Sequence, residues 1–535
     1  MMRVHDDTIA AIATASGAAG LAVVRLSGAR AVEIADEVFR CAHALADAAG
    51  NTLHHGWAVE PARGPGEPRA PEEPPARPFG ARIHARPSLS EALAPAIPRR
   101  SGIVTHSGSA RASIAAQEAL PARAARPVSV PERHISEHPL DEVVVALFRA
   151  PHSYTREDVV EISCHGGAMP ARRVLDALLA CGARLARPGE FTLRAFLNGR
   201  IDLAQAEAVA DLIHAETKAA HELALSQLAG DLSRRLEAVS ERVTDALAEV
   251  EARVDFAEDV GGVEVPPHVS AAIAEAERAL AELLAGADYA RAVREGLRVP
   301  IVGRPNVGKS SLFNALLGEE RAIVTAVPGT TRDRVSEAIE VAGVRVTLSD
   351  LAGLRESLEP VEAIGIARAR EAVEQSTLAV WVVDGAQPLA SEDRWIAEKL
   401  RTKRVLVALN KRDLPALTRE DHVTALLDGE PRRVVAVSAA RREGLEELRA
   451  ALAELLGAQG GGGQAAALGN ARHAEALGRA HAALAQAGAA AARGAPGEIV
   501  ALELRESLAA IGEVTGRSVG EDLLDRIFSR FCIGK

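Results

Sequence analysis

The sequence predicts a multidomain protein in which an α/β domain is inserted into an all-helical domain, after an N-terminal α+β domain. The chain has 535 residues and a typical domain has about 150, so three or four domains are expected. Apolar positions with a helical period occur on both sides of a segment in which strand and helix patterns alternate. The expected ranges are 1–200 for the N-terminal domain, 201–295 and 457–535 for the two parts of the helical domain, and 296–456 for the inserted domain.

Composition and charge limit the class of protein. Hydrophobic residues make up 48% of the chain and charged residues 25%, which is ordinary for a globular protein and excludes a wholly disordered or fibrous one. The chain has 62 basic and 73 acidic residues and a formal charge of −11. This balance argues against a protein that coats nucleic acid through a general basic surface, and it leaves a local RNA site open.

Cysteine usage and the apolar runs indicate a cytoplasmic protein. The four cysteines have no CxxC spacing, so we expect a reducing compartment and no zinc site. They are Cys41, Cys164, Cys181 and Cys532. The chain has no basic leader followed by an apolar core, and no run of about 18 apolar residues, so we expect no membrane segment.

The N-terminal domain has the patterns of a small α+β fold. Two short apolar runs between Thr8 and Ser27 flank a turn of small residues, and Gly20–Ser27 is typical of a strand. Further strands are expected at Leu140–Arg149 and Asp158–Ser163, and a helix at Met169–Ala180.

Residues 61–140 interrupt this domain. They contain 14 of the 27 prolines, 11 arginines and 7 acidic residues, without a sustained apolar period. This composition is typical of a disordered insertion. A solvated insertion is the favoured interpretation, and a segment that contacts RNA is the alternative.

Long amphipathic helices are expected from Ile201 onward. Apolar residues recur at spacings of three and four from Leu225 to Val254, which predicts a single helix of roughly nine turns. Two prolines at 266 and 267 end it, and a second helix is expected over 269–285. A long apolar stripe needs partner helices, and the segment Glu498–Ile511 offers one.

The inserted domain opens with a phosphate-binding loop. The apolar strand Leu297–Val302 precedes Gly303–Ser310, which fits GxxxxGK[ST], and a helix pattern follows. In this pattern backbone N–H groups surround the β-phosphate, Lys309 reaches the β- and γ-phosphates, and Ser310 is a magnesium ligand. A chance glycine turn would not also have the required strand and helix around it.

The motifs that follow indicate guanine and magnesium. Asn410-Lys-Arg-Asp413 follows an apolar strand, and its last carboxylate can accept hydrogen bonds from guanine N1–H and N2–H, which adenine lacks. Two further motifs also end strands, and they are Ser438-Ala-Ala440 and Asp350-Leu-Ala-Gly353. A third, Thr330–Asp333, lies in the loop between the phosphate-binding loop and Asp350. Five such motifs in this order over 297–456 resemble the Ras-like GTPase superfamily.

One position departs from that superfamily. Ras-type enzymes use a Gln after the DxxG glycine to orient water, but Leu354 stands here and cannot hydrogen-bond it. Another polar group must do so, and the candidates in the same segment are Arg355, Glu356, Glu359 and Glu362. With no arginine finger evident, some other cation is expected to balance charge in the transition state.

Several further segments point to one family. The chain ends in Cys532-Ile-Gly-Lys535, and it contains Tyr154–Ile162, His165-Gly-Gly167, Arg187–Phe191 and Phe196–Glu207. Together with the inserted GTPase domain, these segments resemble the bacterial tRNA-modification GTPase family called MnmE or TrmE, over nearly the whole chain outside about 61–137.

This resemblance implies an activity and partners. Members hydrolyse GTP and, with the flavoprotein MnmG (GidA), modify C5 of the wobble uridine U34 of certain tRNAs to carboxymethylaminomethyluridine. The one-carbon unit comes from 5,10-methylene-tetrahydrofolate, of which 5-formyl-tetrahydrofolate is a stable mimic. The resemblance also implies a constitutive homodimer and a heterotetramer with MnmG.

The resemblance assigns roles to individual residues. The folate site corresponds to Arg25, Glu161, Arg200 and Lys535, each of which would otherwise be interpreted as half of a surface ion pair. Potassium takes the place of an arginine finger and is held by Asn306, Thr325, Val327 and Thr330, and magnesium by Ser310 and Thr331. The catalytic residues are Glu362, which orients the attacking water through a second water, Lys309, and Cys532, whose part stays open.

The full GTP site implied by the motifs and the resemblance is a larger set. It comprises Asn306, Val307, Gly308, Lys309, Ser310, Ser311, Thr325, Ala326, Val327, Pro328, Gly329, Thr330, Thr331, Asp350, Leu351, Ala352, Gly353, Asn410, Lys411, Asp413, Ser438, Ala439 and Ala440. Leu351 replaces the usual Thr of the family's DTAG, so this chain has no hydroxyl at that position.

Two other classes of function are weighed against this one. A ribosome-assembly GTPase switch would share the phosphate loop but usually adds a KH or second GTPase domain, and no such pattern occurs. A folate-binding protein with a decayed GTPase is disfavoured because Lys309, Asp350 and Asp413 are intact.

Overall fold

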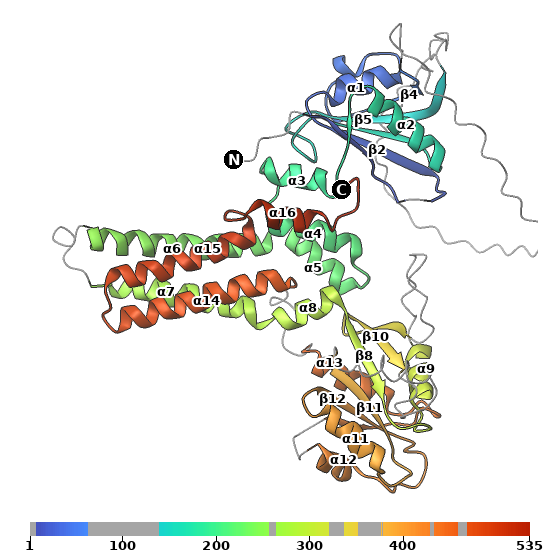
Figure 1. Ribbon diagram of the computed structural model, residues 1–535, viewed down its shortest axis with the longest axis vertical. Helices are drawn as coiled ribbons and strands as arrows, with labels where there is room; N and C mark the ends of the chain where they lie inside the picture. Colours follow the sequence, from blue (N-terminus) through green and yellow to red (C-terminus); the bar gives the residue numbers. More distant parts are fainter. Residues whose placement is uncertain are drawn as a thin grey trace, which may run out of the picture.

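The structure is a computed structural model that describes residues 7–15, 17–61, 138–255, 264–319, 336–350, 376, 378–427, 433–457 and 468–535. Figure 1 shows an elongated helical bundle with two α/β bodies attached near one of its ends. Among the described residues, none of the helices combines the length and apolar character that crossing a bilayer requires.

The N-terminal body is a seven-stranded sheet with the strand order β3-β4-β5-β6-β2-β1-β7. Neighbouring strands are antiparallel except β1 and β7, which are parallel. The strands are β1 (Ile9–Ile12), β2 (Leu21–Ser27), β3 (Phe39–Arg40), β4 (Thr52–Val59), β5 (Pro139–Phe148), β6 (Val159–His165) and β7 (Arg184–Leu185). Alternate residues of β2, β5 and β6 are buried against α1 (Ala31–Val38) and α2 (Ala168–Ala180). The sequence prediction of β2, β5, β6 and α2 is confirmed.

The insertion expected at 61–140 lies mostly outside the described residues, which stop at 61 and resume at 138. Its expected end was placed too late. Pro139 and Leu140 belong to β5, where Pro139 pairs with Val59 of β4. Proline content was the guide to the boundary, but a proline at the first position of a strand is compatible with strand structure.

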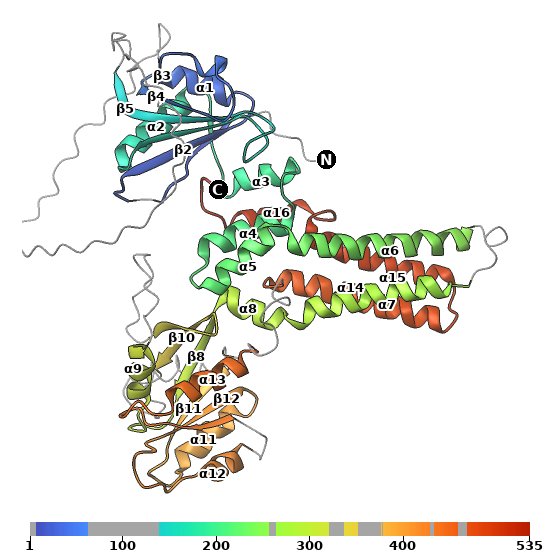
Figure 2. The ribbon, with the colours of Figure 1, turned by 180° about the vertical axis from the view of Figure 1, so that it is seen from behind.

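The helical body is a bundle of four long helices, which lie side by side in Figures 1 and 2. They are α6 (Asp231–Asp255), α7 (Pro267–Ala285), α14 (Ala471–Ala492) and α15 (Gly497–Thr515). Their shared core is built from Leu, Val, Ile and Ala, among them Leu236, Ile273 and Leu484. The first two helices precede the inserted body in the chain and the last two follow it, so the bundle closes only when both parts have been made.

Shorter helices connect the bundle to the other bodies. They are α3 (Glu190–Leu197), α4 (Leu203–His214), α5 (Lys218–Leu228), α8 (Ala287–Glu295) and α16 (Glu521–Phe528). Figure 2 shows α4 and α16 between the N-terminal sheet and the bundle, and α5 toward α8 and the inserted body.

The single helix expected from Leu225 to Val254 is wrong. α5 ends at Leu228 and α6 begins at Asp231, and Gly230 between them has a φ of 81°. Leu225 is 43% exposed, whereas Leu232 and Leu236 are fully buried. The buried residues of α5 pack against neighbours other than the bundle core. The apolar spacing nevertheless continues across the break, because a helical period in the sequence does not show that the packing partner changes.

The inserted body is a six-stranded sheet with the order β13-β12-β11-β8-β10-β9, parallel except for β9. Its strands are β8 (Leu297–Val302), β9 (Ser336–Val341), β10 (Val344–Asp350), β11 (Leu378–Asp384), β12 (Arg404–Asn410) and β13 (Arg433–Ala436). α9 (Lys309–Glu319) and α13 (Leu445–Leu455) cover one face, and α11 (Ser391–Leu400) and α12 (Glu420–Leu426) cover the other. The strand order reverses at β8, so the crevice at its carboxyl end is where such sheets bind ligands.

Candidate functional site

The phosphate-binding loop lies at this carboxyl end of β8. The chain leaves the sheet at Val302 and re-enters regular structure at Lys309, the first residue of α9. Lys309 is buried, and its Nζ donates to the carbonyl oxygens of Gly303 at 3.0 Å and Arg304 at 2.9 Å. The loop thus wraps around the lysine at a helix N-terminus, where backbone N–H groups and the helix dipole favour an anion.

A buried ion pair anchors this loop to the neighbouring helix. Nε of Arg304 lies 2.8 Å from Oδ2 of Asp393, a fully buried residue of α11. Burial raises the pKa of the Asp393 carboxyl, and the Ala390 backbone N–H and Arg304 offset only part of that rise. The sequence analysis missed this pair because no local pattern indicates that position 393 lies beneath the loop.

Asn410 joins three of the predicted motifs. It ends β12, and its Nδ2 donates to the Val307 carbonyl of the loop at 2.8 Å. Its Oδ1 accepts from the backbone N–H of Ala439 at 3.0 Å. The phosphate loop, the Asn410–Asp413 segment and the Ser438–Ala440 segment therefore form one cluster, which we call the nucleotide site.

Lys411 strengthens this arrangement. Its backbone has a φ of 67°, and its Nζ donates to the Asn306 carbonyl at 3.0 Å and to Oδ2 of Asp384 at 2.7 Å. Asp384 is almost fully buried at the end of β11. The lysine thus links the loop to the strand beside it, and Asp384 is a further residue that the sequence analysis missed.

Asp413 has the ionisation state that guanine recognition needs. Its Oδ1 accepts a 2.6 Å hydrogen bond from Oγ of Ser438, and this bond lowers the pKa of the Asp413 carboxyl. Asp413 is therefore a carboxylate at neutral pH and can accept two N–H groups from one base edge.

Several predicted site residues lie outside the described residues. They are Thr325, Ala326, Val327, Pro328, Gly329, Thr330, Thr331, Leu351, Ala352, Gly353, Leu354 and Glu362. Asp350 ends β10, whose backbone pairs with β8 at Ile301, so it reaches the same sheet edge as the loop. Ser310 and Ser311 begin α9 with exposed side chains.

A second cluster forms around Arg25 of β2 in the N-terminal body. Arg25 pairs with Glu161 of β6 in the sheet register, and its Nε lies 2.7 Å from Oε1 of Glu161. The guanidinium lies 5.6 Å from the ring centres of both Tyr154 and Phe191, within the range of a cation–π contact. Its Nη1 donates to the Gly534 carbonyl at 3.2 Å. We call these five residues the Arg25 cluster.

The chain end is fixed in this cluster by its backbone. Gly534 has a φ of 95°, and a Cβ there would lie 2.5 Å from the Ile12 carbonyl oxygen of β1. The Cys532 carbonyl accepts weak bonds from the N–H groups of Gly189 and Lys535, each at 3.4 Å. The side chain of Cys532 is exposed, and Lys535 is half-buried.

Arg200 lies next to the cluster. Its guanidinium is 4.7 Å from the Tyr154 ring centre, and its Nη1 donates to the Tyr154 carbonyl at 2.9 Å. The predicted residues Arg25 and Glu161 therefore make direct contact, and Tyr154 lies between two of the predicted arginines. The two aromatic residues belong to motifs already noted in the sequence, yet their place beside Arg25 was not foreseen.

The comparison with known families decides the assignment. The family domain described as "MnmE helical domain" matches residues 203–532, and the domain described as "GTP-binding protein TrmE N-terminus" matches 8–67 and 89–200. The chain belongs to the MnmE family of tRNA modification GTPases. The stretch that this domain leaves unmatched is 68–88, which is narrower than the 61–137 left out of the family resemblance.

Individual MnmE relatives match over most of their length. A tRNA modification GTPase MnmE from Symbiobacterium thermophilum is 42% identical over 533 residues, which is 99% of this chain and 100% of that protein. One from Geobacter metallireducens is 47% identical over 408 residues, covering 75% of this chain and 87% of the relative. Among solved structures, the FeoB G-domain from Methanococcus jannaschii is 26% identical, covers 30% of this chain and 97% of its own, and has a TM-score of 0.24.

A partly buried charge cluster fixes the segment of the TrmE domain that touches the chain end. Arg184 binds Glu190 at 2.6 Å and Asp7 at 2.7 Å, and Arg194 binds Asp7 at 2.7 Å and Glu157 at 3.1 Å. Burial alone would raise the pKa of the Glu190 and Asp7 carboxyls, but the two arginines lower the pKa of both. Glu190 begins α3 immediately before Phe191, so the cluster sets the position of a ring that contacts Arg25.

Proposed function

We propose that this protein hydrolyses GTP in the modification of tRNA wobble uridines and takes the one-carbon unit from a tetrahydrofolate held beside the Arg25 cluster. One observation supports this most. Arg25 and Glu161, which the family resemblance marks as folate residues, contact each other, and Arg25 also donates to the Gly534 carbonyl. The strands β2 and β6 that carry them belong to a different body from the nucleotide site (Figure 1). A GTPase switch without modification chemistry would have no need of such a cluster.

At the nucleotide site, the described residues fit GTP and Mg²⁺. Lys309 would exchange its two carbonyl partners for the β- and γ-phosphates, and Asp413 would accept from guanine N1–H and N2–H. Ser310, at the start of α9, and Thr331 would hold magnesium. The metal supplies positive charge to the phosphate oxygens as the bond to the γ-phosphate breaks.

Potassium activation is part of the proposal. Asn306 has a left-handed backbone with a φ of 64°, and its carbonyl is held by Lys411, so its side chain is presented from a fixed turn. Asn306 would hold K⁺ together with Thr325, Val327 and Thr330, and K⁺ supplies the charge of an arginine finger. Glu362 would orient the attacking water, a role that Leu354 cannot take.

The Arg25 cluster suits an anionic ligand with a flat ring. Arg200 and Lys535 are basic groups near the cluster that can bind the carboxylates of the folate tail, and Glu161 can accept from the pterin N–H edge. Glu161 is partly exposed, so a ligand can share it with Arg25. The folate supplies the one-carbon unit, and Cys532 is exposed nearby for a role in its transfer.

The proposed partners are a second copy of this chain, MnmG and tRNA. An apolar patch on one face of the N-terminal sheet supports the dimer. Leu53 and Trp57 of β4 are 74% and 38% exposed, and Val144 of β5 is 40% exposed and faces His55 across the strand pair. Such a patch on a sheet face is typical of a protein interface.

The deciding experiment is nucleoside analysis of tRNA from a strain that lacks this gene. We expect carboxymethylaminomethyl groups to be missing from U34 and to return with the wild-type gene. Unchanged wobble nucleosides together with a defect in ribosome assembly would instead support the GTPase switch and contradict this proposal.

The potassium proposal has its own measurement. GTP hydrolysis should rise steeply when Na⁺ is replaced by K⁺, and Asn306→Ala should remove that response because the ion loses a ligand. Glu362→Ala should lower turnover with little loss of nucleotide affinity, since it acts on water. Equal rates of the wild type in the two salts would contradict this part.

A further inference from the structure

We propose that α4 couples the nucleotide site to the Arg25 cluster, and that Glu207 and Asp211 are the positioning residues through which it does so. This rests on the proposed function, because it requires both ligands to bind. Glu207 and Asp211 are four residues apart, so their side chains lie one turn apart on the same side of α4.

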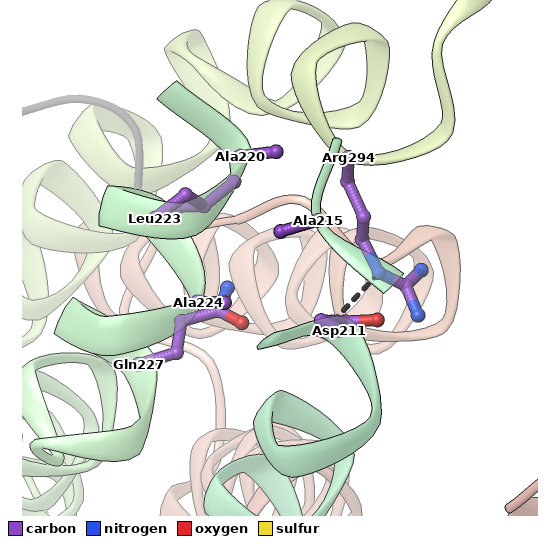
Figure 3. A pocket seen from close by; sticks show the side chains of 7 residues that line it. All are labelled: Asp211, Ala215, Ala220, Leu223, Ala224, Gln227 and Arg294. Atoms are coloured by element: carbon purple, nitrogen blue, oxygen red, sulfur yellow. Dashed lines mark hydrogen bonds and ion pairs between the residues drawn. The ribbon is translucent and has the colours of Figure 1, made fainter. Parts of the chain in front are cut away.

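Asp211 holds the segment that enters the GTPase domain. Its Oδ2 accepts from Nε of Arg294 at 2.7 Å, and this pair lies at one side of a small pocket lined also by Ala215, Leu223 and Gln227 (Figure 3). Arg294 is in the last turn of α8, directly before β8 and the phosphate loop. Burial raises the pKa of Asp211, while Arg294 opposes that rise.

Glu207 holds the segment that returns from the GTPase domain. Its Oε2 lies 2.7 Å from Nη2 of Arg472 and 2.5 Å from Nε2 of His473, which are in the first turn of α14. His473 is fully buried and Glu207 is nearly so. Burial alone would raise the pKa of Glu207, but the hydrogen bonds from His473 and Arg472 lower it to about 2, so the group is a carboxylate.

The turn after α4 contacts the GTPase sheet itself. Oγ1 of Thr217 donates to the Gly343 carbonyl at 2.8 Å, and Oε2 of Glu216 lies 2.8 Å from Nε of Arg345. Gly343 is in the β9–β10 hairpin, and β10 ends at Asp350 of the DxxG motif. A single strand therefore extends from this contact to Asp350, and in Ras-like GTPases the motif that begins there holds magnesium through water and senses the γ-phosphate.

The other end of α4 contacts the helix that leads to the chain end. Leu203 and Ala206 pack in one cluster with Leu524, Ile527 and Phe528 of α16. Phe531 completes this cluster one residue before Cys532. α4 is also held rigid at its start by a capping box, in which Asp202 and Gln205 bind each other's backbone N–H groups. A rotation or shift of α4 is therefore transmitted to the segment that supplies Gly534.

Buried ion pairs suit this task better than apolar contacts do. An apolar interface can slide with little change in energy, whereas a buried carboxylate that loses its partner is strongly disfavoured. Glu207 and Asp211 therefore tie the start of α14 and the end of α8, the helices on either side of the GTPase domain in the chain, to α4. Networks of ion pairs and packed side chains of this kind are the physical means by which coupling between distant sites is carried.

The test measures binding of one ligand in the presence of the other. The dissociation constant of 5-formyl-tetrahydrofolate is determined by calorimetry on the full chain, with and without a non-hydrolysable GTP analogue and Mg²⁺ in K⁺ buffer. Coupled sites typically change each other's affinity by about fivefold or more, and the change is reciprocal. We expect such a factor in the wild type and a factor near one in Glu207→Gln and Asp211→Asn, with each separate affinity nearly unchanged.

A matched control and a rescue exclude a general loss of stability. Glu251→Gln removes a carboxylate that pairs with Arg505 between α6 and α15, away from the contacts of α4 with α8 and α14, and should keep the wild-type factor. The double variant Asp211→Arg with Arg294→Asp should regain part of the coupling that either single change loses.

Each outcome bears on one proposal. If the wild type binds no folate, the proposed function fails, and the coupling with it. If the wild type binds both ligands but their affinities are independent, or if the two variants keep the wild-type factor, the coupling through α4 is wrong and the proposed function stands. Equal loss of coupling in Glu251→Gln would also contradict it, because the effect would then belong to the whole bundle.

Discussion

The nucleotide site and the Arg25 cluster are assembled in opposite ways. The nucleotide site is built from loops at the ends of β8, β12 and β13 in one sheet, and its motifs follow one another in the chain. The Arg25 cluster joins residues that are 509 positions apart, from β2 to the chain end. The first depends on one domain alone, whereas the second depends on how the last residues of the chain pack against the N-terminal body.

This difference decides how each site responds to damage. The carboxyl ends of parallel strands meet at one edge, so the nucleotide site forms wherever its domain folds. Gly534 reaches Arg25 because α16 packs on α4 and because two glycines lack a Cβ where the chain passes closely, Gly189 beside Phe528 and Gly534 beside the Ile12 carbonyl. Changes in the tail should therefore act on one site and leave the other intact.

Deletion of Cys532–Lys535 should give the largest separation of the two sites. We expect tRNA modification to be abolished and GTP hydrolysis to stay nearly intact, because the nucleotide motifs lie within 297–456. Nucleoside analysis and a phosphate-release assay measure the two activities. A truncated protein that still modifies tRNA would remove the chain end from the proposed chemistry.

Asp413→Asn should affect the opposite site. Hydrogen bonds to a charged group contribute about 1.5–3 kcal/mol, so GTP affinity should fall by about 10- to 100-fold. Preference should shift toward xanthine nucleotides, whose base edge suits an amide, while 5-formyl-tetrahydrofolate binds as in the wild type. Glu443→Gln is the control, because it removes a nearby exposed carboxylate that pairs with Arg412. Wild-type protein that hydrolysed ATP as fast as GTP would refute the assignment.

Gly534→Ala tests the Arg25 cluster with a single methyl group. A non-glycine residue in the left-handed region costs about 1–2 kcal/mol, and the Cβ would also approach the Ile12 carbonyl at 2.5 Å. We expect folate affinity to fall about fivefold or more, which corresponds to ~1 kcal/mol, with GTP affinity unchanged. Gly520→Ala is the matched control, since a Cβ at Gly520 meets no atom within 4 Å. An unchanged folate affinity in Gly534→Ala would show that the tail does not shape the site.

A smaller effect is expected in the helix between the two sites. The pKa of Glu207 is about 2 in the folded protein against 4.5 for an ordinary Glu. Its stabilising contribution is therefore complete above about pH 4.5 and is lost as the pH falls toward 2, because the unfolded chain then binds the proton first. Between pH 5 and 3.5 the wild type should lose about 1 kcal/mol more of its free energy of unfolding than Glu207→Gln does. Parallel urea titrations measure this difference, and identical pH profiles would mean that the ion pair does not stabilise the fold.

Sequence analysis was strongest where a motif and its strand were adjacent. Lys309, Asn410 and Asp413 could be assigned because each follows an apolar strand. The ion pairs that support these residues could not be predicted, and they are Arg304 with Asp393 and Lys411 with Asp384. Each pair joins two elements whose separation in the sequence does not determine how close they lie in space.

The helical domain shows the same limit. The apolar period from Leu225 to Val254 persists through Gly230, yet the packing partner changes there and the helix is broken. At the Arg25 cluster, Arg25 and Glu161 were assigned through the family resemblance, while the places of Tyr154 and Phe191 needed the folded chain. The roles of Thr325, Thr331 and Glu362 stay predictions, since these residues lie outside the described part of the chain.

The distance along the chain between Arg25 and Gly534 also has a consequence for protein synthesis. Ribosomes add about 5–20 residues per second, so roughly 25 to 100 seconds separate the translation of two residues that are 509 positions apart. The GTPase domain is complete well before then and can fold while the rest of the chain is still being made. Translation that stops short of the final codons therefore releases a product with its nucleotide site formed and its Arg25 cluster lacking Gly534.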